Sequence, residues 1–187
     1  MKKSFLSVLV IMFMATGALA ANRGEPRNDF ITKTGDYMQF AIPLSALFFS
    51  IGKEDWQGVQ QFGLAVGSTA ATTHVLKYIT NEERPYQAED TDGRTFPSGH
   101  TSFAFSGAAY WQRRYGWYIG APMYAAASFV GYSRVHARMH NWFDVGTAAA
   151  LGIGFNLLFT SRYVPAGTQV TVEPVDDGAM LRFNTTF

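Results

Sequence analysis

The chain has 187 residues, a formal net charge of +1 and no cysteine, which fits one domain with a sizeable core and excludes a disulfide framework. Nearly half of the residues are hydrophobic and only 16% are charged, less than the roughly 25% usual in soluble domains. The composition favours a membrane protein or a deeply buried helical bundle, and the even charge balance argues against nucleic-acid binding.

The first twenty residues have the pattern of an export signal. Lys2 and Lys3 precede an apolar run over 5–14, and small residues at 18–20 suit cleavage before Ala21. The alternative is an uncleaved first membrane helix, although the run is short for the about 20 residues that a span requires. We assign residues 1–20 to a signal peptide and 21–36 to a polar, irregular segment.

Five long runs without charged residues follow, and they predict an all-α bundle of about five long helices over residues 37–163. The runs lie at 37–52, 56–76, 95–112, 115–133 and 145–161. Those at 56–76 and 95–112 are rich in Thr, Ser, Gln and His, and the mean hydropathy of the chain is only −0.01, so we expect these two helices to line a site. Aromatic residues near the run ends favour membrane embedding; a soluble bundle is the alternative.

The tail at 164–187 has a different pattern. Apolar and polar residues alternate over 169–172, Asp176-Asp177-Gly178 is a turn signal, and apolar residues recur at 181, 183 and 187. This pattern predicts a short C-terminal β-hairpin.

Three short motifs lie within or beside these runs. In the first, Lys77 falls in the last turn of a helix that we expect to end near Asn81, and Arg84-Pro85 follows just outside it. Both cations can then face one pocket. Alternatively, Lys77 only offsets the helix dipole and Arg84 pairs with a neighbouring glutamate.

The second motif is Pro97-Ser98-Gly99-His100, which lies between a polar loop and an apolar run. Ser98 or Thr101 can cap a helix whose first N–H groups bind an anion, and Gly99 lets that anion approach the backbone closely. Helix capping beside a chance histidine is the alternative interpretation.

The third motif joins Ser133-Arg134 to His140 and Asp144. Four residues apart on a helix, Asp144 and His140 would share a face, so the carboxylate could fix the imidazole tautomer and leave its other nitrogen for attack on phosphorus. Arg134 offers a planar fork suited to phosphate oxygens. Alternatively, the His–Asp pair only stabilises a helix start.

A metal site is not predicted. His136 lies four residues before His140, but no third ligand follows at a convincing spacing and no paired acidic cluster is present. We expect His136 and Arg138 to lie at the surface or to support the site, and His74 to be a satisfied packing histidine.

Taken in order, the three motifs resemble the signature of the type 2 phosphatidic acid phosphatase (PAP2) superfamily at every defining position from Lys77 to Asp144. The resemblance implies an all-α bundle with its site at one end and no cofactor. It implies that His140 is the nucleophile of a phosphohistidine intermediate, that Asp144 orients it, and that His100 protonates the leaving oxygen. The implied phosphate-binding residues are Lys77, Arg84, Ser98, Gly99 and Arg134.

The implied substrate is a lipid phosphate or pyrophosphate, and the expected location is the inner membrane with the site facing the periplasm. A soluble periplasmic acid phosphatase is the main alternative. A vanadium-dependent haloperoxidase, for which the chain is short, and a non-catalytic membrane scaffold are remote ones. The sequence does not define the oligomeric state.

Overall fold

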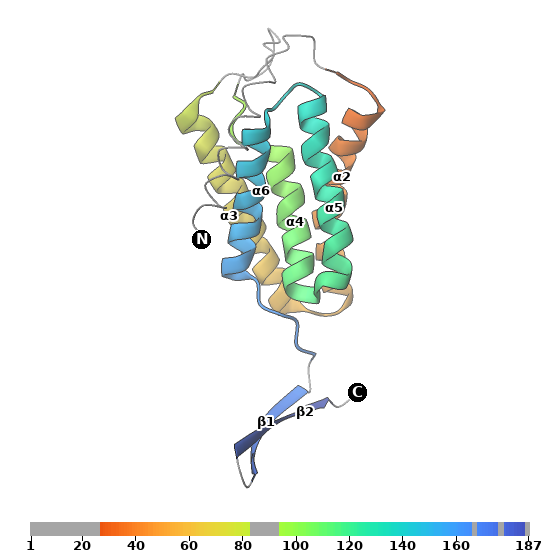
Figure 1. Ribbon diagram of the computed structural model, residues 1–187, viewed down its shortest axis with the longest axis vertical. Coiled ribbons are helices and arrows are strands. Elements are labelled where there is room, and N and C mark those ends of the chain that lie inside the picture. Colours follow the sequence, from red (N-terminus) through yellow and green to blue (C-terminus); the bar gives the residue numbers. More distant parts are fainter. Residues whose placement is uncertain (1–26, 83–93, 166–167, 176–177, 186–187) are drawn as a thin grey trace, which may run out of the picture.

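The computed structural model describes residues 27–82, 94–165, 168–175 and 178–185. Within these ranges five helices form an elongated bundle (Figure 1), which confirms the predicted all-α fold. The helices are α2 (Phe30–Gly52), α3 (Trp56–Thr80), α4 (Gly99–Tyr115), α5 (Trp117–His136) and α6 (Trp142–Phe159). The predicted signal peptide lies outside the described residues.

The segment predicted to be irregular up to residue 36 is helical from Phe30. Asp29 caps α2, because its carboxylate accepts a hydrogen bond from the Thr32 N–H at 3.0 Å. Charged and polar residues within 30–36 obscured this first part of α2 in the sequence, since a search for uncharged runs excludes it.

Helix α4 is the central helix and packs against each of the other four. Its buried side chains are mostly small, including Ala104, Ala108 and Ala109, so neighbouring helices can approach closely. At Gly107 a Cβ would overlap the backbone of Pro43 on α2. The core is completed by apolar side chains from α2 and α5, including the buried Ile42 and Val130.

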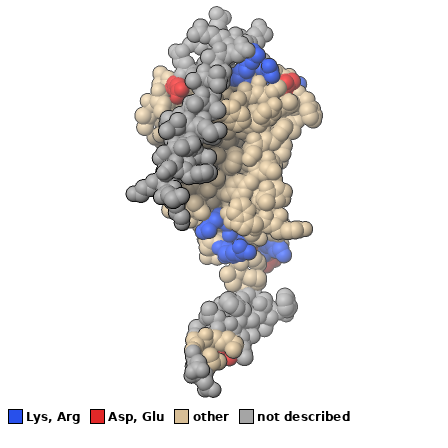
Figure 2. Space-filling view, in the orientation of Figure 1, with Lys and Arg blue, Asp and Glu red and all other residues tan. Residues whose placement is uncertain are grey.

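Large apolar side chains are exposed along the outer faces of the other four helices. Examples are Phe48 on α2, Leu64 on α3, Tyr118 on α5 and Leu158 on α6. In Figure 2 the charged residues on the visible face lie near the two ends of the bundle, with an uncharged band between them. Extended apolar surface of this kind marks contact with a membrane or a partner.

Of the described helices, α6 alone is long and apolar enough to cross a membrane by composition. Helix α4 is too short, with 17 residues, and no 18-residue stretch of α2, α3 or α5 is apolar enough.

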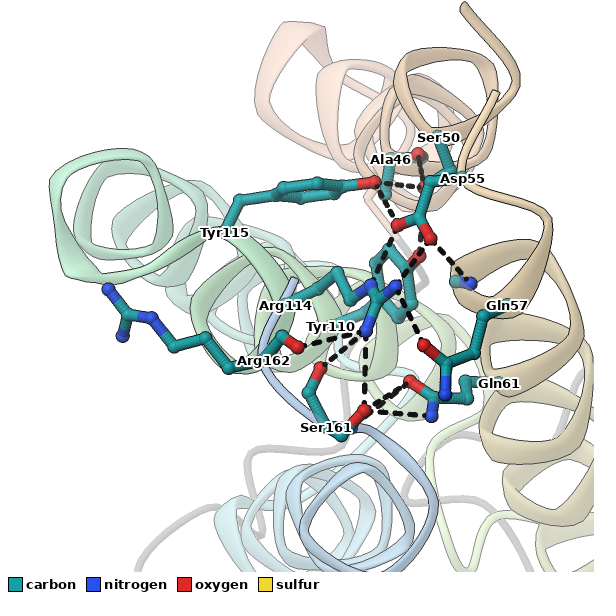
Figure 3. A network of polar contacts seen from close by, with 11 residues as sticks. Ala46, Ser50, Asp55, Gln57, Gln61, Tyr110, Arg114, Tyr115, Ser161 and Arg162 are labelled. Carbon is teal, nitrogen blue, oxygen red and sulfur yellow. Dashed lines mark hydrogen bonds and ion pairs between the residues drawn. The ribbon is translucent and has the colours of Figure 1, made fainter. Parts of the chain in front are cut away.

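The end of the bundle where α6 finishes is held by a buried ion pair (Figure 3). Arg114 in the last turn of α4 pairs with Asp55, the N-cap of α3. Burial alone would raise the pKa of Asp55, but hydrogen bonds from Arg114, the Gly58 N–H and Tyr115 outweigh it and lower the pKa. Arg114 also donates to the Ser161 carbonyl at 3.1 Å, which ties α4 to the chain leaving α6.

Beyond α6, β1 (Thr168–Val175) pairs antiparallel with β2 (Gly178–Thr185). Val175 lies opposite Gly178 in this register, so the chain reverses within the predicted tail. In Figure 1 the hairpin lies beyond the end of the bundle that the Arg114 ion pair holds.

Candidate active site

The described residues of the three motifs gather at the opposite end of the bundle, the upper end in Figure 1. Here α3 and α5 end while α4 and α6 begin. Lys77 is in the last turn of α3, Arg134 is in the last turn of α5, and Gly99 opens α4. The two helix beginnings place the positive ends of two helix dipoles at this end, and these favour an anion.

His140 and Asp144 lie together, but not on one helical face as expected. His140 precedes α6, Asn141 is the N-cap, and Asp144 is the third helical residue. The Asp144 carboxylate accepts from the Asn141 N–H at 3.1 Å, while the Asn141 side chain accepts from the Asp144 N–H at 2.9 Å. This capping box turns the carboxylate back towards His140, with 3.3 Å between Oδ2 and Nδ1.

Thr95 completes this group. Its hydroxyl donates to Asp144 Oδ2 at 2.7 Å and lies 3.1 Å from His140 Nδ1. All three side chains are buried, and the carboxylate is fully enclosed. Because Nδ1 faces the carboxylate, the Nε2 edge of the His140 ring points away from it, which is the orientation that a nucleophilic imidazole requires.

The start of α4 has the geometry predicted for an anion site. Ser98 is the N-cap, and its hydroxyl accepts from the Thr101 N–H at 3.4 Å. A Cβ built on Gly99 would meet no described atom within 4 Å, so the space beside the first turn is open. A phosphate group could therefore approach this backbone.

Arg134 is almost completely buried and held by α2. Its Nη2 donates to the Thr32 carbonyl at 2.7 Å, and its Nη1 donates to the Asp36 carboxylate at 2.6 Å. The close approach depends on Gly35, where a Cβ would overlap the Ser133 side chain. Each guanidinium nitrogen makes one bond to a described residue, including Nε to Ser133 Oγ at 3.1 Å, so within the described ranges two of the five N–H groups are left for a ligand.

His100 faces the same carboxylate, with 3.2 Å between its Nε2 and Asp36 Oδ1. Burial and the charge of Arg134 lower the pKa of His100 to about 4, although Asp36 acts in the opposite direction. A bound anion would raise this pKa by adding negative charge beside the ring.

Lys77 anchors the connection between α3 and α4. Its ammonium group donates to the carbonyls of Arg94 and Thr95 at 3.3 and 3.1 Å. The helix ends as predicted, with Asn81 as a left-handed C-cap. Arg84, which was predicted to bind phosphate, lies outside the described residues.

The remaining histidines differ in their surroundings. His136 lies 2.6 Å from the Asp29 carboxylate, which supports the expected role outside the catalytic group. His74 is exposed, and its ring is tilted against that of Tyr78 with 5.4 Å between ring centroids. It is therefore not the packing histidine that we expected, because no other described helix covers α3 at this position. Within the described ranges, no group of three His, Asp or Glu could hold a metal ion.

Two polar residues of this site were missed in the sequence. Asp36 appeared only as the charge that precedes an uncharged run, and Thr95 as part of a connection. Their partners are 98 and 49 residues away, so no local spacing could identify them.

Known proteins are similar to this chain in sequence and in fold. A model of the PAP2 superfamily matches residues 58–166. The lipid A 4'-phosphatase of Helicobacter pylori strain J99 is 30% identical over 182 residues, which covers 88% of this chain and 85% of the relative. The lipid A 1-phosphatase of Porphyromonas gingivalis is 40% identical over 81 residues, which covers 41% of this chain and 17% of that protein.

Among solved structures, the crystal structure of Aquifex aeolicus LpxE matches with a TM-score of 0.57 and 21% identity, covering 80% of this chain and 92% of that chain. At this identity the match supports the fold alone. The family match extends over more than half of the chain and includes all three motifs. The chain therefore belongs to the PAP2 superfamily and is a phosphatase.

Proposed function

We propose that this protein is a metal-independent phosphatase of a membrane lipid, acting through a phosphohistidine at His140. The observation that carries the proposal is the position of the buried Asp144 carboxylate. It accepts a hydrogen bond from the Thr95 hydroxyl and lies 3.3 Å from His140 Nδ1. An imidazole oriented in this way directs its second nitrogen away from the carboxylate, and we propose that this nitrogen is the nucleophile.

In the first step His140 Nε2 attacks phosphorus, and a P–N bond forms while the P–O bond to the lipid breaks. His100 gives its proton to the departing oxygen. In the second step His100 takes a proton from water, which attacks phosphorus and breaks the P–N bond to release inorganic phosphate. Asp144 stabilises the positive charge that His140 gains in the first step.

The transferred phosphoryl group would be held by cations and backbone donors. Arg134, Lys77 and Arg84 supply the charge, and Ser98 and Gly99 at the start of α4 supply donors at a helix N-terminus. These groups would face the equatorial oxygens, where negative charge is spread in the transition state. A metal ion is then not needed to neutralise it.

The lipid substrate is supported by the surface and by the relatives. Apolar side chains cover the outer helix faces, and α6 is a candidate membrane span. Two relatives are lipid A phosphatases by name. We place the protein in the inner membrane with its site facing the periplasm, as the export pattern at 1–20 indicates, and we expect a lipid phosphate as substrate.

Phosphate release from a panel of lipid phosphates and lipid diphosphates, measured with purified enzyme in detergent and excess EDTA, tests this function. Turnover of at least one lipid without added metal is expected, and strict magnesium dependence would contradict the mechanism. Washing membranes with high salt and carbonate tests the location. Release of the protein into the supernatant would favour the soluble acid phosphatase over the lipid-embedded enzyme.

A further inference from the structure

A groove of about 320 Å³ opens beside the candidate active site. It lies between α2 and α3, with the first turns of α4 as its floor. Gln39 and Phe40 line it from α2, and Gly99, Ser102 and Phe103 line it from α4. Phe40 and Phe103 contact edge to face, with centroids 5.7 Å apart, and join α2 to α4 beside the groove.

The groove is continuous with the phosphate end of the site. Lys77 and Gly99, both proposed to bind phosphate, line one part of it. From Lys77 the lining follows α3 through Thr73 to Thr69, at steps of four residues or about 6 Å along the helix axis. A group attached to a phosphate at Lys77 would therefore lie beside Thr73.

Thr73 carries a polar atom without a protein partner. Its side chain is only 5% exposed, and its hydroxyl has no hydrogen-bond partner among the described residues. Other threonines of α3 bond to the carbonyl four residues earlier, as Thr69 does to Ala65 at 2.7 Å and Thr80 to Leu76 at 2.8 Å. A buried hydroxyl of this kind normally has a partner, so a ligand atom is a suitable one.

The described lining has little charge away from the phosphate end. Lys77 and His74 are its only ionisable residues, and the rest consists of Phe, Ala, Gly, Thr, Ser and Gln. A carboxylate or a second phosphate placed in this groove would lose hydration without gaining a described counter-ion beyond Lys77, which is unfavourable.

We propose that this groove binds the part of the substrate next to the transferred phosphate and selects an uncharged leaving group that carries a hydroxyl or carbonyl oxygen for Thr73. The enzyme then prefers lipid phosphomonoesters to lipid diphosphates, because the leaving group of a diphosphate is itself a charged phosphate. This inference rests on the proposed function and specifies its substrate class.

Phosphatidate and diacylglycerol pyrophosphate provide a matched pair, since both carry the same diacylglycerol. The expected kcat/KM of the wild-type enzyme is at least about tenfold higher for phosphatidate, the effect of one unfavourable contact in a binding pocket. Equal or greater kcat/KM for the pyrophosphate would overturn the inference. Hydrolysis of para-nitrophenyl phosphate is measured in parallel. If the enzyme hydrolyses para-nitrophenyl phosphate but does not prefer phosphatidate to the pyrophosphate, only this inference fails. If it hydrolyses none of the three substrates, the proposed function is contradicted.

Thr73→Val removes the hydroxyl and keeps the shape of the side chain. It should lower kcat/KM for phosphatidate about tenfold, the value of one hydrogen bond. The loss on para-nitrophenyl phosphate should be smaller, because its leaving group carries no hydroxyl or carbonyl oxygen for Thr73. Thr73→Ser, which restores the hydroxyl, should retain phosphatidate turnover, and Thr34→Val on an exposed part of α2 is the matched control. An equal loss on both substrates would show a structural role and contradict the assignment.

Ala70 lines the groove and is exposed, so a charge can be added there. Ala70→Lys should raise the ratio of pyrophosphate to phosphatidate turnover about tenfold by supplying a counter-ion. Ala70→Leu controls for bulk and should leave the ratio unchanged. A ratio that responds equally to both variants would contradict selection by charge.

Discussion

The carboxylate of Asp36 on α2 pairs with Arg134 on α5, with 2.6 Å between Oδ1 and Nη1. The same oxygen lies 3.2 Å from His100 Nε2, so one anion bridges two groups proposed to act on phosphate. Asp36 therefore offsets part of the positive charge that would attract a phosphate substrate. It also holds His100, the proposed acid, in place.

Asp36→Asn should have two opposite effects. Inhibition by inorganic phosphate should become tighter, because Arg134 loses a competing carboxylate, while kcat should fall at least about tenfold because the His100 proton is less well held. Steady-state kinetics with phosphate as inhibitor measures both. Asp29→Asn is the matched control, since Asp29 pairs with His136 outside the proposed catalytic group. Parallel weakening of phosphate binding and turnover would argue against this role.

The pH dependence follows from the lowered pKa of His100. The acid form is needed, so kcat/KM, which reports the free enzyme, should fall as pH rises through the His100 pKa of about 4. A bound phosphate raises this pKa. In the pH profile of kcat, which reports the enzyme–substrate complex, the fall in activity should therefore occur at higher pH than in the profile of kcat/KM. Asp36→Asn removes a group that raises the pKa and should move the kcat/KM limb to lower pH. A limb shifted to higher pH in this variant would contradict the assignment.

Thr95→Val tests the support of His140. Removing the hydroxyl takes a hydrogen bond from Asp144, so kcat should fall about 10- to 100-fold, the value of a bond to a charged group, with little change in KM. Thr160→Val is a suitable control, because Thr160 is also buried and bonded, to Asn156, at the other end of the bundle. Comparable loss of kcat in both variants would indicate a general effect on packing.

Gly99→Ala separates activity from stability. Alanine is the better helix former by up to about 1 kcal/mol, and its Cβ meets no described atom, so the melting temperature should stay the same or rise. The methyl group would occupy space beside the proposed anion site, and kcat/KM should fall about 100-fold. Gly63→Ala, also in open space on α3, should leave kcat/KM unchanged. Full activity in Gly99→Ala would exclude this helix start as the phosphate site.

The opposite end of the bundle should affect stability alone. Arg114→Met leaves Asp55 buried without its partner and should lower the free energy of unfolding by about 3–5 kcal/mol, with kcat retained in the folded fraction. Chemical denaturation in detergent measures this change. Arg113→Met, next along α4, removes a side chain that forms no described ion pair and should have a small effect. Equal destabilisation by the two variants would contradict the importance of the Arg114 pair.

Local patterns predicted the helices and several features of the site, because each depends on residues near one another in sequence. The cap at Ser98 and the end of α3 at Asn81 follow from such patterns. The sequence predicted that His140 and Asp144 share one face of a helix. The two residues are close, but the predicted geometry is wrong, since Asn141 caps a helix that begins after His140. The contact of Asp36 with Arg134 depends on the close packing of α2 against α5 at Gly35. Such a contact between distant residues cannot be predicted from the spacing of residues in the sequence.

The central claim is that His140 becomes phosphorylated. Wild-type enzyme mixed with a lipid substrate carrying labelled phosphate and quenched in base, where phosphohistidine survives, should retain label that mass spectrometry assigns to His140. His140→Ala should retain no label and release no phosphate, while His136→Ala should still label. Undiminished phosphate release by His140→Ala, or label on another residue of the wild-type enzyme, would contradict the account.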